Sequence, residues 1–520
     1  MKKKKLLSML LVLAMVLSLM PAVSIPAKAA NASDFSTLKT NLENGYDVTL
    51  YGDITISSTI TVTGNVILNL NGHTLRRDTT KNHAFEVKGT LTVRNTSSTS
   101  SGITGHSIAS SRTDESGYGS IFYVNGGTLK LNTGSAGDRQ IILERNRHDN
   151  GGAVSAANGG KVNMYDNVTI TNCQAEGGNS INKGGAIYLD GTNGSCTFSM
   201  YGGTIENCSA ANGGGVYLYK STFTMSGGTI TNCTANRETE YRGGAVYLYG
   251  GTFNMQGGTI SDCSAHESGG VFVDQSGKMK MTGGTLSGNK ATSDWDEKAT
   301  SIMAMWGGTA EIDGGYIAAD GSSSLPAVNY GDSESITITS GRFSFDNTYI
   351  YKYNGNKQTN LTGRTCNITL DGNGGSNSNT TATWNSNLSP VTPPTRTGYK
   401  FLGYFTAKEG GEQYYNADGS AYSASGRGTK CDYVGSATLY AHWELAPCTV
   451  TLNPNNGTGG TGSVTAYNGS AMPTSGVTMP TRTGYTFAGY YDNTTGGTQY
   501  YTAAGASARA WNKTGTAATL

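Results

Sequence analysis

Apolar and polar residues alternate in short runs along much of the chain. Residues 242–265, RGGAVYLYGGTFNMQGGTISDCSA, contain three such runs, AVYLY, TFNM and TISDC, each separated from the next by a Gly-Gly pair. Alternation with a period of two places every second side chain on one face, so each run predicts a β-strand with one buried face. Glycine reaches the positive-φ conformations that tight corners use. We therefore predict a unit of three strands joined by glycine corners.

This unit is repeated. Gly-Gly-Thr followed by an apolar residue recurs at Gly202, Gly227, Gly257 and Gly283, and the steps between copies, counted from Met200, are 25, 30 and 26 residues. Such a period without helical spacing is typical of a solenoid. We predict an all-β chain in which a parallel β-helix pairs each strand with its counterpart one coil away, at ~4.8 Å. Like side chains then stack in ladders.

Two ladders can be named from the repeat. Phe198, Phe223 and Phe253 share one inward position. A second position is shared by cysteine and asparagine and holds Asn146, Cys173, Cys208, Cys233, Cys263 and Asn289. Stacked side chains with parallel vectors are poorly aimed for disulfide bonds. We expect these thiols to be unbridged.

The first 29 residues have the pattern of a secretory signal peptide. A basic start, Lys2–Lys5, precedes an apolar run, and Ala27-Lys28-Ala29 supplies a small-x-small cleavage site. The apolar run is too short to span a membrane, which takes about 20 residues. We assign residues 1–29 as a signal peptide and expect a secreted chain without a membrane span, located at the cell surface or cell wall.

Residues 30–46 are predicted to cap the solenoid. Phe35, Leu38 and Leu42 have helical spacing, and Gly45 is a plausible C-terminal stop. A short amphipathic helix here covers a strand edge that would otherwise be open to aggregation. The solenoid itself is assigned to residues 47–357.

A different repeat follows the solenoid. PTRTGYKFLGYF and PTRTGYTFAGYY occupy residues 394–405 and 480–491, and the first copy closes with ATLYAHWE. These motifs resemble the Listeria–Bacteroides repeat, also called the internalin B-type repeat, which implies two small β-grasp-like stalk modules of bacterial surface proteins. We assign them to 366–444 and 448–520. The second copy stops at ATL, so we expect it to be truncated.

The solenoid also resembles known families. Its Gly-Gly-rich coils are similar to the right-handed β-helix of the pectin-lyase-like superfamily. GGA[VI] motifs at 151–154, 184–187 and 243–246, with LERN and LSGN, are similar to chlamydial polymorphic membrane proteins. Those proteins are adhesins, and the resemblance implies a binding function on a right-handed parallel β-helix.

Charge and histidine content narrow the function. The formal net charge is +1, whereas a protein that binds nucleic acid requires a concentrated basic face. The sequence therefore predicts no nucleic-acid partner. The six histidines are scattered, so the sequence predicts no zinc site. We assign no cofactor and no metal.

An outward-facing aromatic strip is the first candidate site. One strand of each coil alternates inward aliphatic residues with outward aromatic ones, at Tyr123, Tyr188, Tyr217, Tyr247 and Phe272. Flat aromatic faces with hydroxyl edges suit a glycan or a peptide surface. Alternatively, such pairs simply stabilise the sheet. Ser155 and Ala156 interrupt the strip.

Variable insertions after the Cys/Asn position are the second candidate. Their acidic residues should lie close together on one edge of the solenoid. Loops on a rigid scaffold often bind ligands. Carboxylates gathered on such loops would suit a weak calcium site. The alternative is solvated loop tips. The acids are Glu176, Glu238, Glu240, Glu267, Asp294 and Asp296.

Catalysis is not favoured by the placement of the acids. Asp190 and Asp274 share one outward column, but Tyr219 and Tyr249 lie between them, which sets the acids ~14 Å apart, too far for a catalytic pair. We assign no catalytic residue. The sequence therefore predicts an adhesin-like protein that binds a glycan or a surface protein of a host or neighbouring cell. The alternatives are a polysaccharide-degrading lyase or hydrolase and a purely structural surface or biofilm protein.

Overall fold

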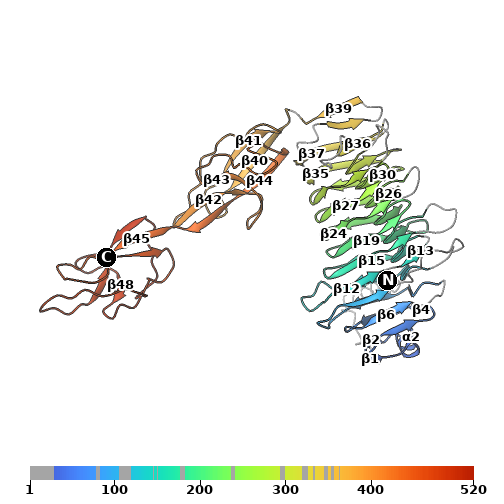
Figure 1. The fold of residues 1–520 in the computed structure, drawn as a ribbon, viewed down its shortest axis with the longest axis horizontal. Helices are drawn as coiled ribbons and strands as arrows, with labels where there is room; N and C mark the ends of the chain where they lie inside the picture. Colours follow the sequence, from blue (N-terminus) through green and yellow to red (C-terminus); the bar gives the residue numbers. More distant parts are fainter. Residues whose placement is uncertain are drawn as a thin grey trace, which may run out of the picture. The chain divides into compact units, whose positions relative to one another are not determined.

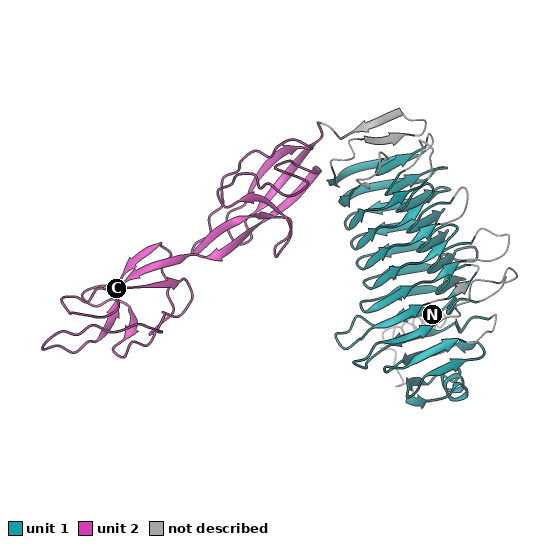
Figure 2. Ribbon diagram, viewed as in Figure 1, with its two compact units in different colours: residues 1–360 teal, residues 361–520 magenta. Residues whose placement is uncertain are grey.

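The structure is a computed structural model. It describes residues 29–77, 82–104, 119–144, 146–148, 150–175, 182–235, 241–292, 299–318, 326–331, 334–344, 349–352, 356–361 and 363–520. The assigned signal peptide lies outside these residues except for Ala29. The chain forms two compact units, residues 1–360 and 361–520, shown in two colours in Figure 2.

The first unit is a parallel β-helix (Figure 1), with strands stacked coil upon coil. One ladder runs through β1 (Ala29–Ala32), β2 (Asp47–Leu50), β5 (Asn65–Asn69), β8 (Thr90–Arg94), β11 (Thr128–Leu131), β15 (Lys161–Met164), β19 (Thr197–Met200), β23 (Thr222–Met225), β27 (Thr252–Met255), β31 (Lys278–Met281), β35 (Thr309–Ile317) and β37 (Ser335–Phe343). The next comprises β3 (Ile54–Ile56), β6 (Thr74–Arg77), β9 (Ser101–Thr104), β12 (Ile141–Glu144), β16 (Val168–Thr171), β20 (Thr204–Glu206), β24 (Thr229–Thr231), β28 (Thr259–Ser261) and β32 (Thr285–Ser287), and ends on β35.

Two further ladders run along the solenoid, and the shorter one is described in six coils. The longer comprises β4 (Ile60–Val62), β7 (Phe85–Val87), β10 (Phe122–Asn125), β14 (Val154–Ala157), β18 (Ile187–Asp190), β22 (Val216–Tyr219), β26 (Val246–Tyr249), β30 (Val271–Asp274), β34 (Ile302–Ala304), β36 (Val328–Tyr330), β38 (Tyr349–Lys352) and the antiparallel β39 (Asn356–Asn360). The shorter comprises β13 (Arg147–His148), β17 (Gln174–Ala175), β21 (Ser209–Ala210), β25 (Thr234–Ala235), β29 (Ser264–Ala265) and β33 (Lys290–Ala291). The sequence predicted three strands per coil, because a two-residue strand is too short to show alternation.

The predicted stacking is confirmed. Phe198 stacks on Phe223 with ring centroids 4.6 Å apart, and Phe223 on Phe253 at 4.7 Å. All three side chains are buried. The strands pair in register, so that Met225 lies beside Met200 on one side and Met255 on the other. The core of the solenoid is thus a set of ladders of like residues.

The cysteine position is a ladder of free thiols. Cys173, Cys208, Cys233 and Cys263 are buried and unbridged. The backbone N–H of Cys233 donates to Sγ of Cys263 at 3.4 Å, and the N–H of Cys263 donates to Oδ1 of Asn289 at 3.1 Å. Sulfur and amide oxygen therefore perform the same task, accepting the N–H of the preceding coil, which explains why cysteine and asparagine share this position.

The N-terminal end is closed by a helix and a strand. Helix α2 (Phe35–Glu43) begins after Asp34, whose carboxylate accepts the Thr37 N–H at 2.9 Å. Leu38 and Leu42 are buried, and the helix contacts β1, β2 and β4. Strand β1, which the sequence pattern did not predict, pairs with β2. It thereby satisfies the hydrogen-bonding groups along the outer edge of β2. No helix in the described part of the chain is long and apolar enough to cross a membrane.

The second unit contains two small β modules, each with its own apolar core. The first has the strand order β41 (Ser378–Thr383), β40 (Thr365–Asp371), β44 (Tyr433–Leu445), β42 (Tyr399–Phe405), β43 (Gln413–Asn416). The second has β46 (Ser463–Tyr467), β45 (Pro447–Thr451) and β49 (Ala517–Thr519) in one sheet and β47 (Gly489–Tyr491) with β48 (Gln499–Thr502) in another. Residues 363–520 contain no helix.

Candidate ligand-binding pocket on the outer face of the solenoid

Strands β18, β22, β26 and β30 present two columns of side chains on the outer face of the solenoid. The first column contains Tyr188, Tyr217, Tyr247 and Phe272, with successive ring centroids 5.7, 4.9 and 5.5 Å apart. The second contains Asp190, Tyr219, Tyr249 and Asp274 in register. The aliphatic residues between them face the core, as the alternation predicted.

The first column is not the exposed strip that the sequence predicted. Tyr217, Tyr247 and Phe272 are only 3%, 4% and 0% exposed. They form an apolar cluster of their own with Ala299 and Met303, on the side of the sheet opposite to the core. The expectation of an open aromatic surface was therefore wrong for these three residues.

The glycines at the corners between strands allow the backbone to pass close to the first column, which explains part of its burial. Gly243 has a φ of 65°, and a Cβ there would lie 2.4 Å from the carbonyl oxygen of Val246 and 3.1 Å from Cβ of Tyr247. Gly213 has the same geometry one coil earlier, with a φ of 64° and a Cβ that would lie 2.4 Å from the Val216 oxygen. Only glycine lets the backbone pass this close to the tyrosine column.

Tyr123 stands apart from the other aromatic residues. Its register neighbour in the next coil is Ser155, which in turn pairs with Tyr188. Ser155 thus interrupts the strip as predicted, and Tyr123 stacks instead on His83 with ring centroids 4.6 Å apart.

A cavity of about 660 Å³ opens over the two columns. We call it the aromatic pocket. It is within the size range of small-molecule sites. Its walls come from the outer columns, the corners and the strand end after β34; they are Lys183, Asn212, Tyr217, Tyr219, Tyr241, Arg242, Tyr247, Tyr249, Asp274, Gln275 and Trp306.

Arg242 is held rigidly at the wall of the pocket. Its Nε and Nη2 atoms donate to the two carboxylate oxygens of Glu267 at 2.7 and 3.0 Å. The guanidinium lies 4.5 Å from the ring centroid of Trp306 and 5.3 Å from that of Phe272. Burial opposes its charge, but the hydrogen bond and charge of Glu267 outweigh burial and raise the pKa of Arg242. Arg242 therefore stays charged and covers Phe272.

Asp274 carries an unused acceptor. Its side chain is 3% exposed; Oδ2 accepts the Tyr247 hydroxyl, while Oδ1 is buried and has no hydrogen-bond partner among the described residues. Burial raises the pKa of Asp274, and the Tyr247 hydroxyl, the Arg242 charge and the Gln275 N–H offset part of that rise. A buried polar atom without a partner costs free energy unless a ligand or water satisfies it.

The tyrosine hydroxyls around Asp274 remain donors. Burial, followed by neighbouring charges, raises the pKa of Tyr217 and of Tyr247 above the ordinary value for tyrosine. Both hydroxyls therefore keep their protons at neutral pH.

Among the described residues, Asp274 is the only carboxylate that lines the aromatic pocket. Asp190 lies three coils away along the same column, ~14 Å at one strand spacing per coil. Glu267 places both oxygens on Arg242. The lining thus combines aromatic ring faces, the two cations Lys183 and Arg242, and one free acceptor on Asp274. This set is suited to holding a polyhydroxylated ring.

The predicted loop acids are only partly described. Glu176, Glu238, Glu240, Asp294 and Asp296 lie outside the described residues, and Glu267 forms the pair with Arg242. Within the described ranges, no three or more His, Cys, Asp or Glu side chains gather as a metal site would require.

Several pocket residues were missed as site residues. Tyr219 and Tyr249 repeat in the same VYLY strands as the predicted aromatic column, and that repetition could have identified them. Arg242, Lys183 and Trp306 lie in corners without a periodic pattern, so no sequence signal placed them here.

Comparison with known proteins concerns the second unit. Residues 367–442 and 449–510 match the Listeria-Bacteroides repeat domain family, as the PTRTGY motifs predicted. No curated protein and no solved structure matches the chain. The second unit therefore carries two copies of a repeat domain that is typical of surface-associated proteins.

Proposed function

We propose that the protein is a secreted, adhesin-like surface protein whose solenoid binds a glycan in the aromatic pocket. The two C-terminal repeats act as its stalk. One observation carries the proposal: the buried Asp274 leaves Oδ1 without a partner beside a cavity lined by aromatic rings. A sugar hydroxyl would satisfy that oxygen.

The aromatic residues supply the rest of a sugar site. Tyr219 and Tyr249 are half-buried and stack with centroids 5.5 Å apart, and Trp306 is 44% exposed. An aromatic face contacts the apolar C–H face of a pyranose while hydroxyl edges form hydrogen bonds. Lys183, 5.4 Å from the Tyr217 ring centroid, adds a cation at the rim.

Binding is better supported than hydrolysis. Retaining and inverting glycosidases place two carboxyl groups about 5 to 9.5 Å apart. The described part of the pocket lining supplies one carboxylate, Asp274, and the nearby Glu267 is engaged by Arg242. The alternative of a glycoside hydrolase therefore requires a second free carboxylate beyond the described lining of the pocket.

A glycan array probed with residues 30–520 tests the proposal. We expect a saturable hit whose affinity falls about tenfold in Trp306→Ala and in Asp274→Asn, because each loses one anchor of the sugar. Tyr201→Ala is the matched control: Tyr201 is 48% exposed and stacks on Tyr165, which is not a lining residue. Tyr201→Ala should bind like the unaltered protein.

Three outcomes contradict glycan binding in the pocket. If Trp306→Ala and Asp274→Asn bind every hit at full affinity, the ligand lies elsewhere. If the protein instead releases reducing ends or unsaturated uronates from a polysaccharide, and Asp274→Asn abolishes the release, the enzymatic alternative holds. A protein that binds no glycan and releases no sugar favours the purely structural alternative.

A further inference from the structure

The first C-terminal module holds two cysteines in one core. Cys366 is the second residue of β40, and Cys431 lies two residues before β44 begins. Both side chains are fully buried and belong to the same apolar cluster. The structure shows both as free thiols. Because the two cysteines are far apart in the sequence, only the fold of the module brings them together.

Backbone pairing holds the two cysteines against the same neighbouring strands. Cys366 pairs with Ala382 of β41 and with Gly435 of β44. Cys431 forms a bridge with Trp384, which follows Ala382 by two residues, and its N–H and C=O groups are both hydrogen-bonded to the backbone. Main-chain hydrogen bonds therefore fix the position of each cysteine.

The two thiols lie within hydrogen-bonding reach of each other. The Cys366 thiol donates to Cys431, and this hydrogen bond lowers the pKa of Cys431, although burial opposes the change. The same hydrogen bond, followed by burial, raises the pKa of Cys366. Since the thiolate is the reactive form of cysteine, Cys431 is the nucleophile of the pair.

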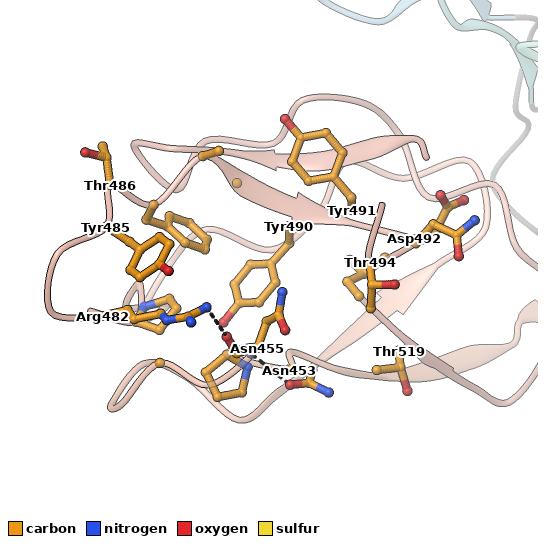
Figure 3. A pocket seen from close by; sticks show the side chains of 18 of the residues that line it. Asn453, Asn455, Arg482, Tyr485, Thr486, Tyr490, Tyr491, Asp492, Thr494 and Thr519 are labelled. Carbon is orange, nitrogen blue, oxygen red and sulfur yellow. Dashed lines mark hydrogen bonds between the residues drawn. The ribbon is translucent and has the colours of Figure 1, made fainter. Parts of the chain in front are cut away.

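The second module shares enough structure with the first for its positions to be compared. Arg482 donates to the Asn455 carbonyl at 3.3 Å, a hydrogen bond drawn in Figure 3. In the first module, Arg396 donates to the Asn373 carbonyl at 3.4 Å. Each of these arginines belongs to the repeated PTRTGY motif. Equivalent residues of the two copies therefore have equivalent surroundings.

The second module has one thiol where the first has two. Cys448 is the second residue of β45 and is the counterpart of the cysteine in β40. Trp511 takes the place of Cys431, because the residue that follows, Asn512 or Asp432, accepts a tyrosine hydroxyl in each module. Cys448 and Trp511 are buried in one core. Cys448 thus serves as a control for a buried thiol without a thiol partner.

We propose that Cys366 and Cys431 form a disulfide bond in the secreted protein. The bond closes the chain from β40 to the start of β44 and encloses β41, β42 and β43 in one covalent loop. Closing a long loop stabilises a domain by restricting its unfolded chain. Disulfide bonds persist in oxidising compartments outside the cytosol, so the inference rests on the secretion in the proposed function and not on the aromatic pocket.

The bond forms by two exchange steps with a low-molecular-weight disulfide. The Cys431 thiolate attacks one sulfur of that disulfide and displaces a thiolate, which leaves a mixed disulfide at Cys431. Cys366 then passes its proton to the displaced thiolate and attacks Sγ of Cys431, which displaces the second thiolate. The two protein thiols lose two electrons, and the external disulfide is reduced to two thiols. Because both cysteines are fully buried in the folded module, the exchange takes place before the core closes.

Refolding of residues 30–520 in a mixture of oxidised and reduced glutathione tests the bond. The remaining thiols are alkylated in denaturant, and the digested protein is analysed by mass spectrometry. We expect one linked pair of peptides, Cys366 with Cys431, that separates on reduction, and complete alkylation of every other cysteine. In Cys431→Ala, Cys366 should be alkylated completely, whereas Cys448→Ala, the matched control, should keep the link.

Thermal unfolding gives a second readout. The oxidised protein should unfold the first module at a temperature about 10 °C or more above that of Cys366→Ala/Cys431→Ala, because the variant lacks the covalent loop. Three results would overturn the proposal: no linked peptides after refolding, links to other cysteines as frequent as the expected one, or equal unfolding temperatures. Cys366→Ala/Cys431→Ala should bind glycan like the unaltered protein, so failure of the glycan array leaves this test unaffected.

Discussion

At the scale of single residues, the exposure of side chains on the outer face of the solenoid depends on which of them the corners between strands cover. Tyr247 faces away from the core and is nevertheless buried, because the corner at Gly243 passes over it. Asp274 is also buried, and its Oδ1 has no hydrogen-bond partner among the described residues. His83, near the other end of the sheet, is half-buried and stacks on Tyr123.

The burial of His83 predicts a pH dependence of stability. Burial, followed by the nearby His148 and Arg77, lowers the pKa of His83 from 6.5 to about 4, and Glu86 opposes this. The folded state therefore binds fewer protons than the unfolded state between these pH values. Stability from this group is complete above pH 6.5 and falls by about 3 kcal/mol as pH drops to 4.

Urea unfolding followed at pH 7, 5.5 and 4 measures this loss. His83→Gln should flatten the fall in the free energy of unfolding between pH 7 and 4. An equal slope in His83→Gln and the unaltered protein would show that His83 does not titrate as described.

At the scale of elements, each strand is stabilised by the strands one coil before and after it. Phe223 stacks between Phe198 and Phe253, and Met225 between Met200 and Met255. A side chain in the middle of such a ladder loses two partners when it is truncated, whereas an outward tyrosine such as Tyr201 loses one.

Phe223→Ala tests the ladder. The change leaves a cavity in a fully buried position and should lower the free energy of unfolding by about 3 to 5 kcal/mol. Chemical unfolding monitored by circular dichroism gives the value. Tyr201→Ala, on an exposed stacked pair, should change it by less than about 1 kcal/mol, and similar losses in the two variants would contradict the ladder.

At the scale of the whole molecule, the solenoid is a one-dimensional stack in which each coil contacts its neighbours. β27 lies one coil after β23 in the same register, from Thr222 beside Thr252 to Met225 beside Met255. A complete coil can therefore be removed without changing the side chains that meet at the new junction.

Deletion of residues 222–251 removes one such coil. We expect the shortened chain to fold into a less stable β-helix, whose circular dichroism spectrum keeps the β-sheet shape of the unaltered protein. The aromatic pocket should be lost, because Arg242, Tyr247 and Tyr249 are removed. Deletion of residues 222–236, half a coil, is the control and should unfold the solenoid, since the strands that remain cannot close a coil. Equal behaviour of both deletions would contradict the stacked-coil register.

The sequence by itself determined the β-helix, its ladders and the likeness of the second unit to a surface-protein repeat. These are consequences of a local rule: period-two alternation and glycine corners place residues such as Phe198 and Phe223 at equivalent points of successive coils. The tertiary structure alone decided what covers the outer face and which residues line the aromatic pocket. Corner residues such as Arg242 and Trp306 follow no period, so their meeting over Phe272 depends on how separate coils fold together.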